Sequence, residues 1–179
     1  MNVDGAGLVD EAQFIASPNC DDRPPGASID LLVIHNISLP PGVFGGAAVI
    51  DLFMNRLDPQ AHPYFENIAA LRVSAHFLVR RDGALLQFVP CERRAWHAGR
   101  SQWCGRDHCN DFSIGIELEG ADDVAYSDAQ YAHLGALARA LYRRYPIVAS
   151  AGHSDIAPGR KTDPGPHFDW DRYRQQLHK

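Results

Sequence analysis

The stretch Phe112-Ser113-Ile114-Gly115-Ile116-Glu117-Leu118-Glu119 alternates between large apolar residues and small or acidic ones. A period of two is typical of a β-strand, so the apolar side chains face one side of a sheet and the others face the opposite side. A carboxylate in the middle of such a strand costs too much free energy to bury without a partner. Glu117 is therefore a candidate general base. A surface glutamate like Glu119 is an equally good interpretation of this strand taken alone.

Further strands are expected on both sides of this one. Residues 29–35 are a short apolar run that predicts a buried strand ending at His35. Residues 74–81 and 84–89 flank an Asp-Gly dipeptide that favours the tight turn of a β-hairpin. A short strand over 147–151 leads to His153.

Helices are expected between and after these strands. Ser127 and Gln130 form a capping box at the start of a helix over 128–145, which has apolar residues at helical spacing. Residues 47–56 have a helical spacing too, and Asp169 could cap a last helix through Leu177. Segments 38–46 and 58–71 are predicted to be loops. Strands interleaved with helices predict an α/β fold, a mixed central sheet flanked by helices.

Composition limits the possible partners. The chain has 179 residues, which fits a single domain over 1–179. A net charge of −5 argues against nucleic acid or an anionic membrane as partner. There is no apolar run of about 20 residues and no recognisable export signal, and there are only four cysteines. We therefore expect reduced thiols and a cytoplasmic location, with a monomer as the default.

The segment Gly152–Pro166 combines His153, Lys161 and Asp163 within a stretch rich in proline and glycine. Each residue alone has an ordinary explanation, such as a structural histidine or a turn carboxylate. Together with His35, however, the two imidazoles and one carboxylate make a three-ligand set for zinc that leaves a fourth position open. Ligands spread along the chain suit a catalytic site better than a structural one. The pattern indicates hydrolysis.

A second cluster competes with this one. His97, Cys104, His108 and Cys109 lie close together in the sequence and could in principle bind zinc. Their spacing is irregular and has no second Cys doublet to match it, unlike structural zinc sites. Free cysteines and unliganded histidines are the better expectation.

The chain resembles the zinc N-acetylmuramoyl-L-alanine amidases of the type 2 amidase and peptidoglycan-recognition fold. The segments that carry the resemblance follow one another along nearly the whole chain, and the last two are highly specific: 33–40 (VIHNISLP), 72–76 (RVSAH), 94–99 (RAWHAG), 110–120 (NDFSIGIELEG) and 153–166. Among these enzymes the chain is most similar to the cytoplasmic amidases that act on 1,6-anhydromuropeptides. The expected substrate is then a small anhydromuropeptide, cut between the lactyl group of the sugar and L-alanine during peptidoglycan recycling.

The resemblance also implies roles for individual residues. One zinc ion per chain would be held by His35, His153 and Asp163, with Glu117 and Lys161 completing the catalytic set. Substrate contacts are implied for Asn36, Tyr64, Arg72, Trp96 and His97. Two positions depart from the family pattern. Ala75 stands where some relatives have a tyrosine, and His108 stands where we expect an arginine, which leaves a stem-peptide contact open.

Three alternatives to this function remain at the level of sequence. One is a non-catalytic muropeptide receptor on the same fold, which would need neither Glu117 nor Lys161. Another is an amidase that acts on intact cell wall, which the lack of an export signal disfavours. The most distant is an interaction protein that zinc merely stabilises.

Overall fold

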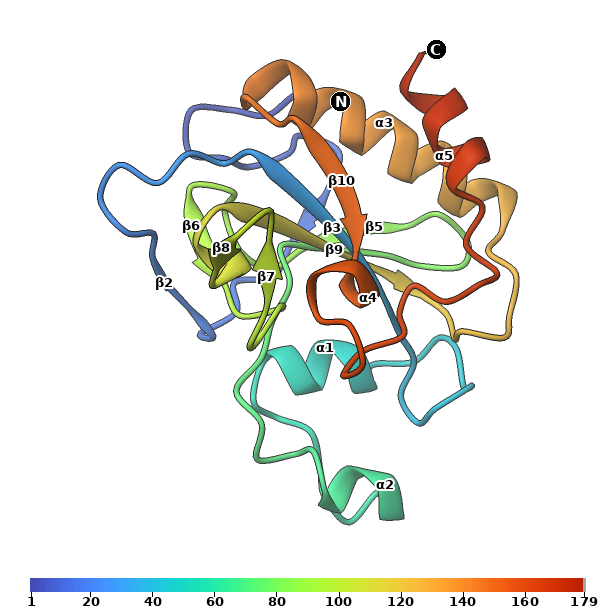
Figure 1. The fold of residues 1–179 in the computed structure, drawn as a ribbon. Helices are drawn as coiled ribbons and strands as arrows, with labels where there is room; N and C mark the ends of the chain where they lie inside the picture. Colours follow the sequence, from blue (N-terminus) through green and yellow to red (C-terminus); the bar gives the residue numbers. More distant parts are fainter. Residues whose placement is uncertain (179) are drawn as a thin grey trace.

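Six strands form one mixed sheet at the centre of the molecule (Figure 1). The computed structural model describes residues 1–178 of the chain. In spatial order the strands are β1 (Gln13–Phe14), β5 (Leu85–Gln87), β4 (Phe77–Val79), β9 (Ser113–Glu119), β3 (Leu31–Ile37) and β10 (Ala149–Gly152). Strands β4, β9, β3 and β10 are parallel to one another, whereas β5 is antiparallel to β4. The predicted α/β class and the predicted hairpin are confirmed.

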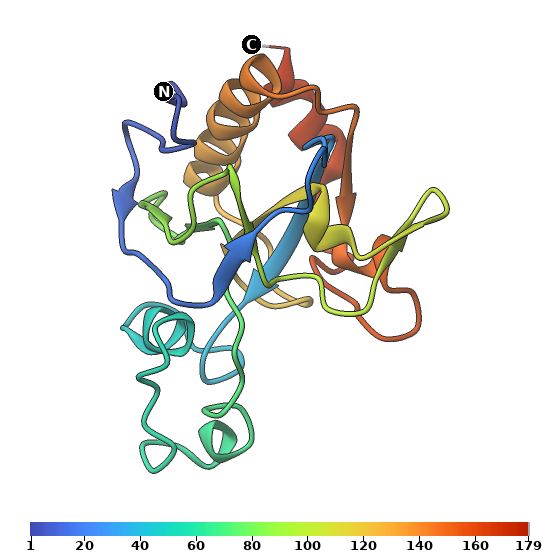
Figure 2. The same ribbon diagram turned by 90° about the vertical axis from the view of Figure 1, so that its left-hand side faces the viewer.

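Helices cover both faces of the sheet (Figures 1 and 2). Helix α3 begins after a Ser127–Gln130 capping box, as predicted, and packs with α5 over one face. The apolar side chains of β9, at Ile114, Ile116 and Leu118, join the core on that face. The helices are α1 (Ala48–Phe53), α2 (Pro63–Glu66), α3 (Asp128–Arg144), α4 (His153–Ile156) and α5 (Trp170–Leu177), with a 3₁₀ turn η1 at Cys109–Asp111.

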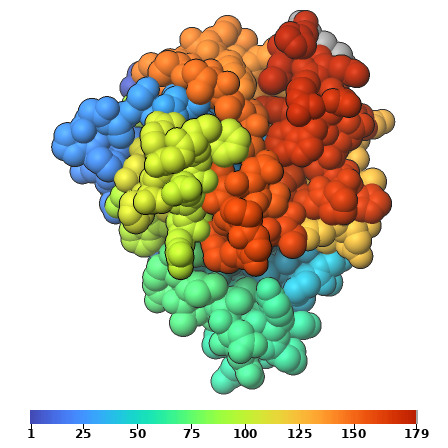
Figure 3. Space-filling model, in the orientation of Figure 1, coloured from blue at the N-terminus to red at the C-terminus, as the bar shows by residue number. Residues whose placement is uncertain are grey.

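The opposite face of the sheet carries the site. A second core cluster, which includes Phe53 of α1 and Leu78 of β4, holds residues 39–73 against this face. In Figure 3 the cyan and green surface of this segment forms a separate lobe at the lower side of the molecule. A third cluster, which includes Ile156 of α4, covers Leu31 and Val33 at the start of β3. The part of this face around His35 and Glu117 stays open. It becomes the floor of a cleft.

Some elements differ from expectation. Strand β3 continues two residues beyond His35, because Asn36 and Ile37 still pair with β9. Helix α1 is shorter than 47–56, and the predicted loop 58–71 contains the short helix α2. Two small antiparallel pairs escaped prediction, namely β2 (Cys20–Asp22) with β6 (Arg93–Ala95) and β7 (Gln102–Trp103) with β8 (Arg106–Asp107). No helix within residues 1–178 is long and apolar enough to cross a membrane.

Candidate active site and metal centre

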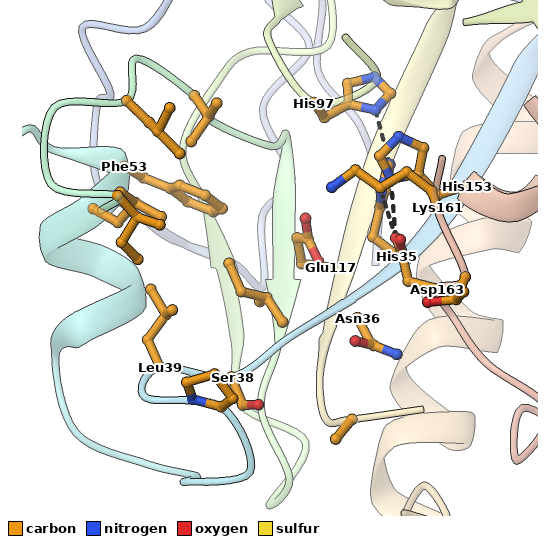
Figure 4. Close-up of a pocket in the computed structure, with 18 of the residues that line it drawn as sticks. His35, Asn36, Ser38, Leu39, Phe53, His97, Glu117, His153, Lys161 and Asp163 are labelled. Atoms are coloured by element: carbon orange, nitrogen blue, oxygen red, sulfur yellow. Dashed lines mark hydrogen bonds and ion pairs between the residues drawn. The ribbon is translucent and has the colours of Figure 1, made fainter. Parts of the chain in front are cut away.

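A cleft of about 670 Å³ opens above β3 and β9. One wall comes from segment 36–42, α1 and the segment around α2, and the other comes from residues 160–163. Figure 4 shows Leu39 and Phe53 on the first wall and Lys161 and Asp163 on the second. Clefts of this size that combine an apolar lining with a few convergent polar groups are typical of small-molecule sites.

The three predicted metal ligands meet in this cleft. His35 comes from β3, His153 is the first residue of α4, and Asp163 lies in the loop that follows α4. The Nδ1 atom of His35 lies 3.0 Å from the Nδ1 atom of His153 and 3.1 Å from Oδ2 of Asp163. Nδ1 of His153 lies 3.0 Å from the same oxygen. Because β10 pairs with β3 in parallel, the chain brings the two histidines together although 118 positions separate them.

The donor set fits a metal ion. Nε2 of His153 lies 3.1 Å from the carbonyl oxygen of Ala98, which can only accept a hydrogen bond. Nε2 therefore carries the ring proton, and Nδ1 has a free lone pair. In the neutral ring, that lone pair faces the carboxylate of Asp163. Burial lowers the pKa of His35 to about 4, so its imidazole is neutral near pH 7. Two imidazoles and a carboxylate at this spacing form a three-ligand cation site. Among residues 1–178 this is the one such cluster.

Glu117 lies opposite His35 in the β3–β9 register, so the two side chains lie on the same face of the sheet. Its side chain lines the cleft, and its Oε2 atom is buried without a hydrogen-bond partner. Burial, reinforced by the negative charge of Asp163, raises the pKa of Glu117 well above its usual value, against an opposing effect of Lys161. A buried carboxyl with one unpaired oxygen and a raised pKa has the properties of an acid–base group.

Ser113 and Gly115 are small residues on the Glu117 side of β9, where small side chains could leave room for a ligand or metal. In the structure the ring of His97 fills that space instead. A Cβ atom at Gly115 would lie 2.4 Å from Cγ of His97. The open floor of the cleft therefore begins at Glu117.

Lys161 lines the cleft on the same wall as Asp163, and Figure 4 shows its side chain beside His153. The residue is exposed, which leaves its ammonium group available to a bound molecule. The neighbouring Arg160 is engaged in hydrogen bonds to the backbone. Its guanidinium donates to the carbonyl oxygens of Ala98 and Arg100 and so ties this wall to segment 98–100.

Four of the five predicted substrate-contact residues line the cleft: Asn36, Tyr64, Trp96 and His97. Asn36 donates to Asp122 at 2.7 Å, and Tyr64 stands on α2 with 41% of its surface exposed. The indole N–H of Trp96 donates to Asp21 at 3.1 Å. Arg72 is the exception, because its guanidinium donates to the carbonyls of Ala70 and Leu71 and the residue does not line the cleft.

The competing cysteine cluster does not assemble. All four cysteines are free, with Cys109 buried and Cys104 exposed on the β7–β8 turn. His97 faces the metal ligands, while His108 is exposed and starts η1.

Several residues of the site were missed by sequence reasoning. Asp122 and Thr162 line the cleft, and Asp21 fixes Trp96 from β2. The carboxylate of Asp21 also accepts two bonds from Arg94, which in turn binds Asp111. Thr162 stands between two predicted site residues, a signal that could have been used. Nothing in the sequence pairs Asp21 with Trp96, which lies 75 positions away.

Comparison with known proteins connects this site to a family. Residues 25–166 match the family model Amidase_2, described as N-acetylmuramoyl-L-alanine amidase. The chain is 59% identical to the 1,6-anhydro-N-acetylmuramyl-L-alanine amidase AmpD of Citrobacter freundii over 170 residues, which cover 94% of this chain and 91% of that protein.

Solved structures agree with the sequence comparison. A crystal structure of a selenomethionine AmpD derivative superimposes with a TM-score of 0.96 at 57% identity and covers 98% of this chain and 99% of that one. A second similar structure is the complex of the amidase AmiD from E. coli with anhydro-N-acetylmuramic acid-L-Ala-D-gamma-Glu-L-Lys. It has a TM-score of 0.62 at 32% identity and covers 87% of this chain and 60% of that one.

Proposed function

The chain belongs to the N-acetylmuramoyl-L-alanine amidase family, and we propose that it is a zinc enzyme that cleaves small 1,6-anhydromuropeptides. The bond cut is the amide between the lactyl carbonyl of 1,6-anhydro-N-acetylmuramic acid and L-alanine of the stem peptide. The names of its relatives support this choice of substrate. The observation that carries the proposal is the convergence of His35, His153 and Asp163 beside the unpaired carboxyl oxygen of Glu117.

Zinc is the metal that this donor set favours. Two imidazoles and one carboxylate would hold the ion here, and this ligand set is typical of hydrolytic zinc sites, which keep a fourth position open. When bound, zinc supplies Lewis-acid polarisation of the lactyl carbonyl and lowers the pKa of a water molecule toward 7. The protein residues around it then have to move one proton and stabilise one developing charge.

Glu117 is the group that moves the proton. The Glu117 side chain lines the cleft, so its carboxylate can accept the proton of the attacking water. The same carboxyl can then donate that proton to the leaving nitrogen of L-alanine, which departs as an amine. Its raised pKa suits the second step, because the carboxyl keeps the proton until it is delivered to the leaving nitrogen.

Lys161 is the group that stabilises charge. Its ammonium stands on the cleft wall next to the metal ligands, where the carbonyl oxygen becomes negative in the tetrahedral intermediate. Trp96 and Tyr64 offer aromatic surfaces for the sugar or the peptide, and Asn36 offers an amide. Arg72 lies outside the lining, so its contact with a peptide carboxylate would need an extended substrate.

The cellular setting belongs to the same proposal. Four free cysteines suit a reducing compartment, which supports a cytoplasmic role in recycling. All the proposed residues come from one chain, so a monomer with a single domain suffices for activity.

The proposal is tested by giving the zinc-loaded protein two substrates in parallel, anhydromuramyl-tripeptide and intact peptidoglycan, with mass-spectrometric detection of products. We expect free tripeptide from the small substrate and little or no release from the wall. Equal cleavage of both would overturn the choice of substrate. Zinc retention without cleavage of either would overturn catalysis and favour a muropeptide receptor.

A further inference from the structure

We infer that His97 is a positioning residue: its Nδ1 accepts a hydrogen bond from Nε2–H of His35, which leaves Nδ1 of His35 as a metal donor. The inference rests on the proposed metal site. It departs from the substrate contact that family resemblance implied for His97. The direction of the hydrogen bonds behind the site and the narrow space around the His97 ring support this role.

The hydrogen bonds run in one direction only. Ser113 has a single hydroxyl proton, and its Oγ lies 2.5 Å from the carbonyl oxygen of Cys109, which can only accept. Oγ of Ser113 must therefore accept from Nε2–H of His97 at 3.1 Å. A neutral imidazole has one N–H, so Nδ1 of His97 is an acceptor. It lies 2.9 Å from Nε2 of His35, which is then the donor.

This sequence of bonds fixes the metal-facing atom of His35. With its proton on Nε2, His35 presents a bare Nδ1 to His153 and Asp163. Histidine ligands in metal sites commonly donate their other N–H to an outer partner, which fixes the tautomer and the ring orientation. Here that outer partner is a second histidine instead of a carboxylate. His97 therefore orients the His35 ring without placing a negative charge behind the metal site.

The ring of His97 has almost no freedom to turn. It lies against Gly115, where a Cβ atom would come within 2.4 Å of Cγ of His97. Its plane is at 87° to that of His35, with ring centroids 5.0 Å apart. Only 9% of its surface is exposed. Both of its ring nitrogens are engaged, so neither is free to bind substrate.

The backbone that carries His97 also orients the other imidazole. Oδ1 of Asn110 accepts from the N–H of His97 at 3.2 Å and from the N–H of Ala98 at 2.8 Å. The carbonyl of Ala98 in turn accepts the Nε2 proton of His153 at 3.1 Å. Two consecutive residues thus set the tautomers of both histidine ligands. A substitution of His97 should therefore act most directly on metal affinity, which it should weaken.

A matched pair of variants separates the two roles of His97. In His97→Asn the amide oxygen can replace Nδ1 as acceptor, whereas His97→Leu has a similar shape and no acceptor. We expect His97→Leu to bind zinc about 10- to 100-fold more weakly in competition with a chromogenic chelator. His97→Asn should recover most of this loss. Ser113→Ala should weaken binding in the same direction, and His167→Leu, at an exposed position, serves as control.

The result that overturns the inference is unchanged zinc affinity in His97→Leu, with a raised KM that would assign His97 to the substrate. The pattern of nitrogen protons gives a second test that needs no variant to fold and no substrate. Long-range ¹H–¹⁵N spectra of the zinc-free protein, labelled at histidine, should place the His97 proton on Nε2. A proton on Nδ1 of His97 would refute the inferred hydrogen bonds from His35 to His97 and from His97 to Ser113, even in an active amidase. Conversely, the expected tautomer in an inactive protein would refute only the proposed function.

Discussion

Glu117 pairs with His35 across β3 and β9, and no hydrogen bond reaches its Oε2 atom. Because the carboxyl is buried and close to Asp163, its pKa is raised, and ionising it in the folded protein is unfavourable. The unfolded chain loses this proton near the ordinary pKa. In the metal-free protein Glu117 therefore destabilises the fold as pH rises above that value, until it ionises in the folded state too.

Glu117→Gln should stabilise the metal-free protein at neutral pH, since glutamine has no charge to bury. For each pH unit between the unfolded and folded pKa values of Glu117, the free energy of unfolding of the wild type falls by about 1.4 kcal/mol. The variant has no such dependence at this position. Thermal unfolding of both proteins at pH 5 and pH 7.5 measures the effect. The gap in Tm should widen with pH. An equal Tm at pH 7.5 would contradict the raised pKa.

The same substitution should leave zinc bound but reduce kcat by about 10²- to 10⁴-fold, the range for loss of a general acid–base group. Zinc content per chain and steady-state kinetics on anhydromuramyl-tripeptide check this. A variant that turns over as fast as the wild type would remove Glu117 from the reaction.

Lys161→Ala should lower kcat by about 10²- to 10³-fold, the usual cost of removing one donor to an oxyanion, with a smaller change in KM. Lys161→Arg keeps the positive charge and should retain more activity than alanine. A change confined to KM in the alanine variant would reassign Lys161 to substrate binding.

The alternation of residues in β9 predicts its structure correctly. Its apolar residues join the core under α3, and its other face carries Glu117. The pairs β2–β6 and β7–β8 could not be predicted, because strands of two or three residues have too few positions to show a period. Their pairing depends on contacts between distant segments, such as that of Asp21 with Arg94. The end of β3 was not predicted exactly, because it depends on how far β3 pairs with the distant strand β9.

The β2–β6 pair gives a prediction about Trp96. Asp21 fixes the indole N–H and is itself held by Arg94. If Trp96 contacts the substrate, Asp21→Ala should raise KM by about 3- to 10-fold with little change in kcat, as expected for loss of roughly one hydrogen bond. Asp22→Ala removes the neighbouring, more exposed carboxylate and is the matched control. Equal KM values in both variants would contradict this role.

The site is assembled from segments far apart in the chain, with 118 positions between His35 and His153. The residue types of His35, His153 and Asp163 suggested a metal site, and family resemblance selected them as a set. Their meeting point follows from the parallel pairing of β3 with β9 and β10. The role of His97 could not be predicted, because it depends on which nitrogen faces Ser113 and which faces His35. Only the three-dimensional structure shows which partner each ring nitrogen of His97 faces.

Buried histidines should make the metal-free fold sensitive to acid. Burial lowers the pKa of His35 to about 4 and that of His76 to about 3, below the ordinary value of 6.5. Below pH 6.5 the unfolded chain takes up protons that the folded protein does not. Stability is therefore present above pH 6.5 and falls by up to about 1.4 kcal/mol per pH unit for each histidine as pH drops toward 4.

Denaturant titrations of metal-free Glu117→Gln between pH 7 and pH 4.5 measure this loss, since the variant removes the opposing effect of Glu117. A steady fall in the free energy of unfolding is expected over this range. A constant value would show that these histidines titrate in the folded state near their ordinary pKa.

We propose that this three-ligand site hydrolyses the amide between the lactyl group and L-alanine. The most direct test is mass spectrometry of the products from anhydromuramyl-tripeptide in H₂¹⁸O, with zinc-loaded, chelator-stripped and zinc-restored protein. We predict free tripeptide and an anhydro sugar whose lactyl carboxylate carries one ¹⁸O, both lost on stripping and regained with zinc. Cleavage at another bond, equal turnover without metal, or no cleavage by the loaded protein would contradict the claim.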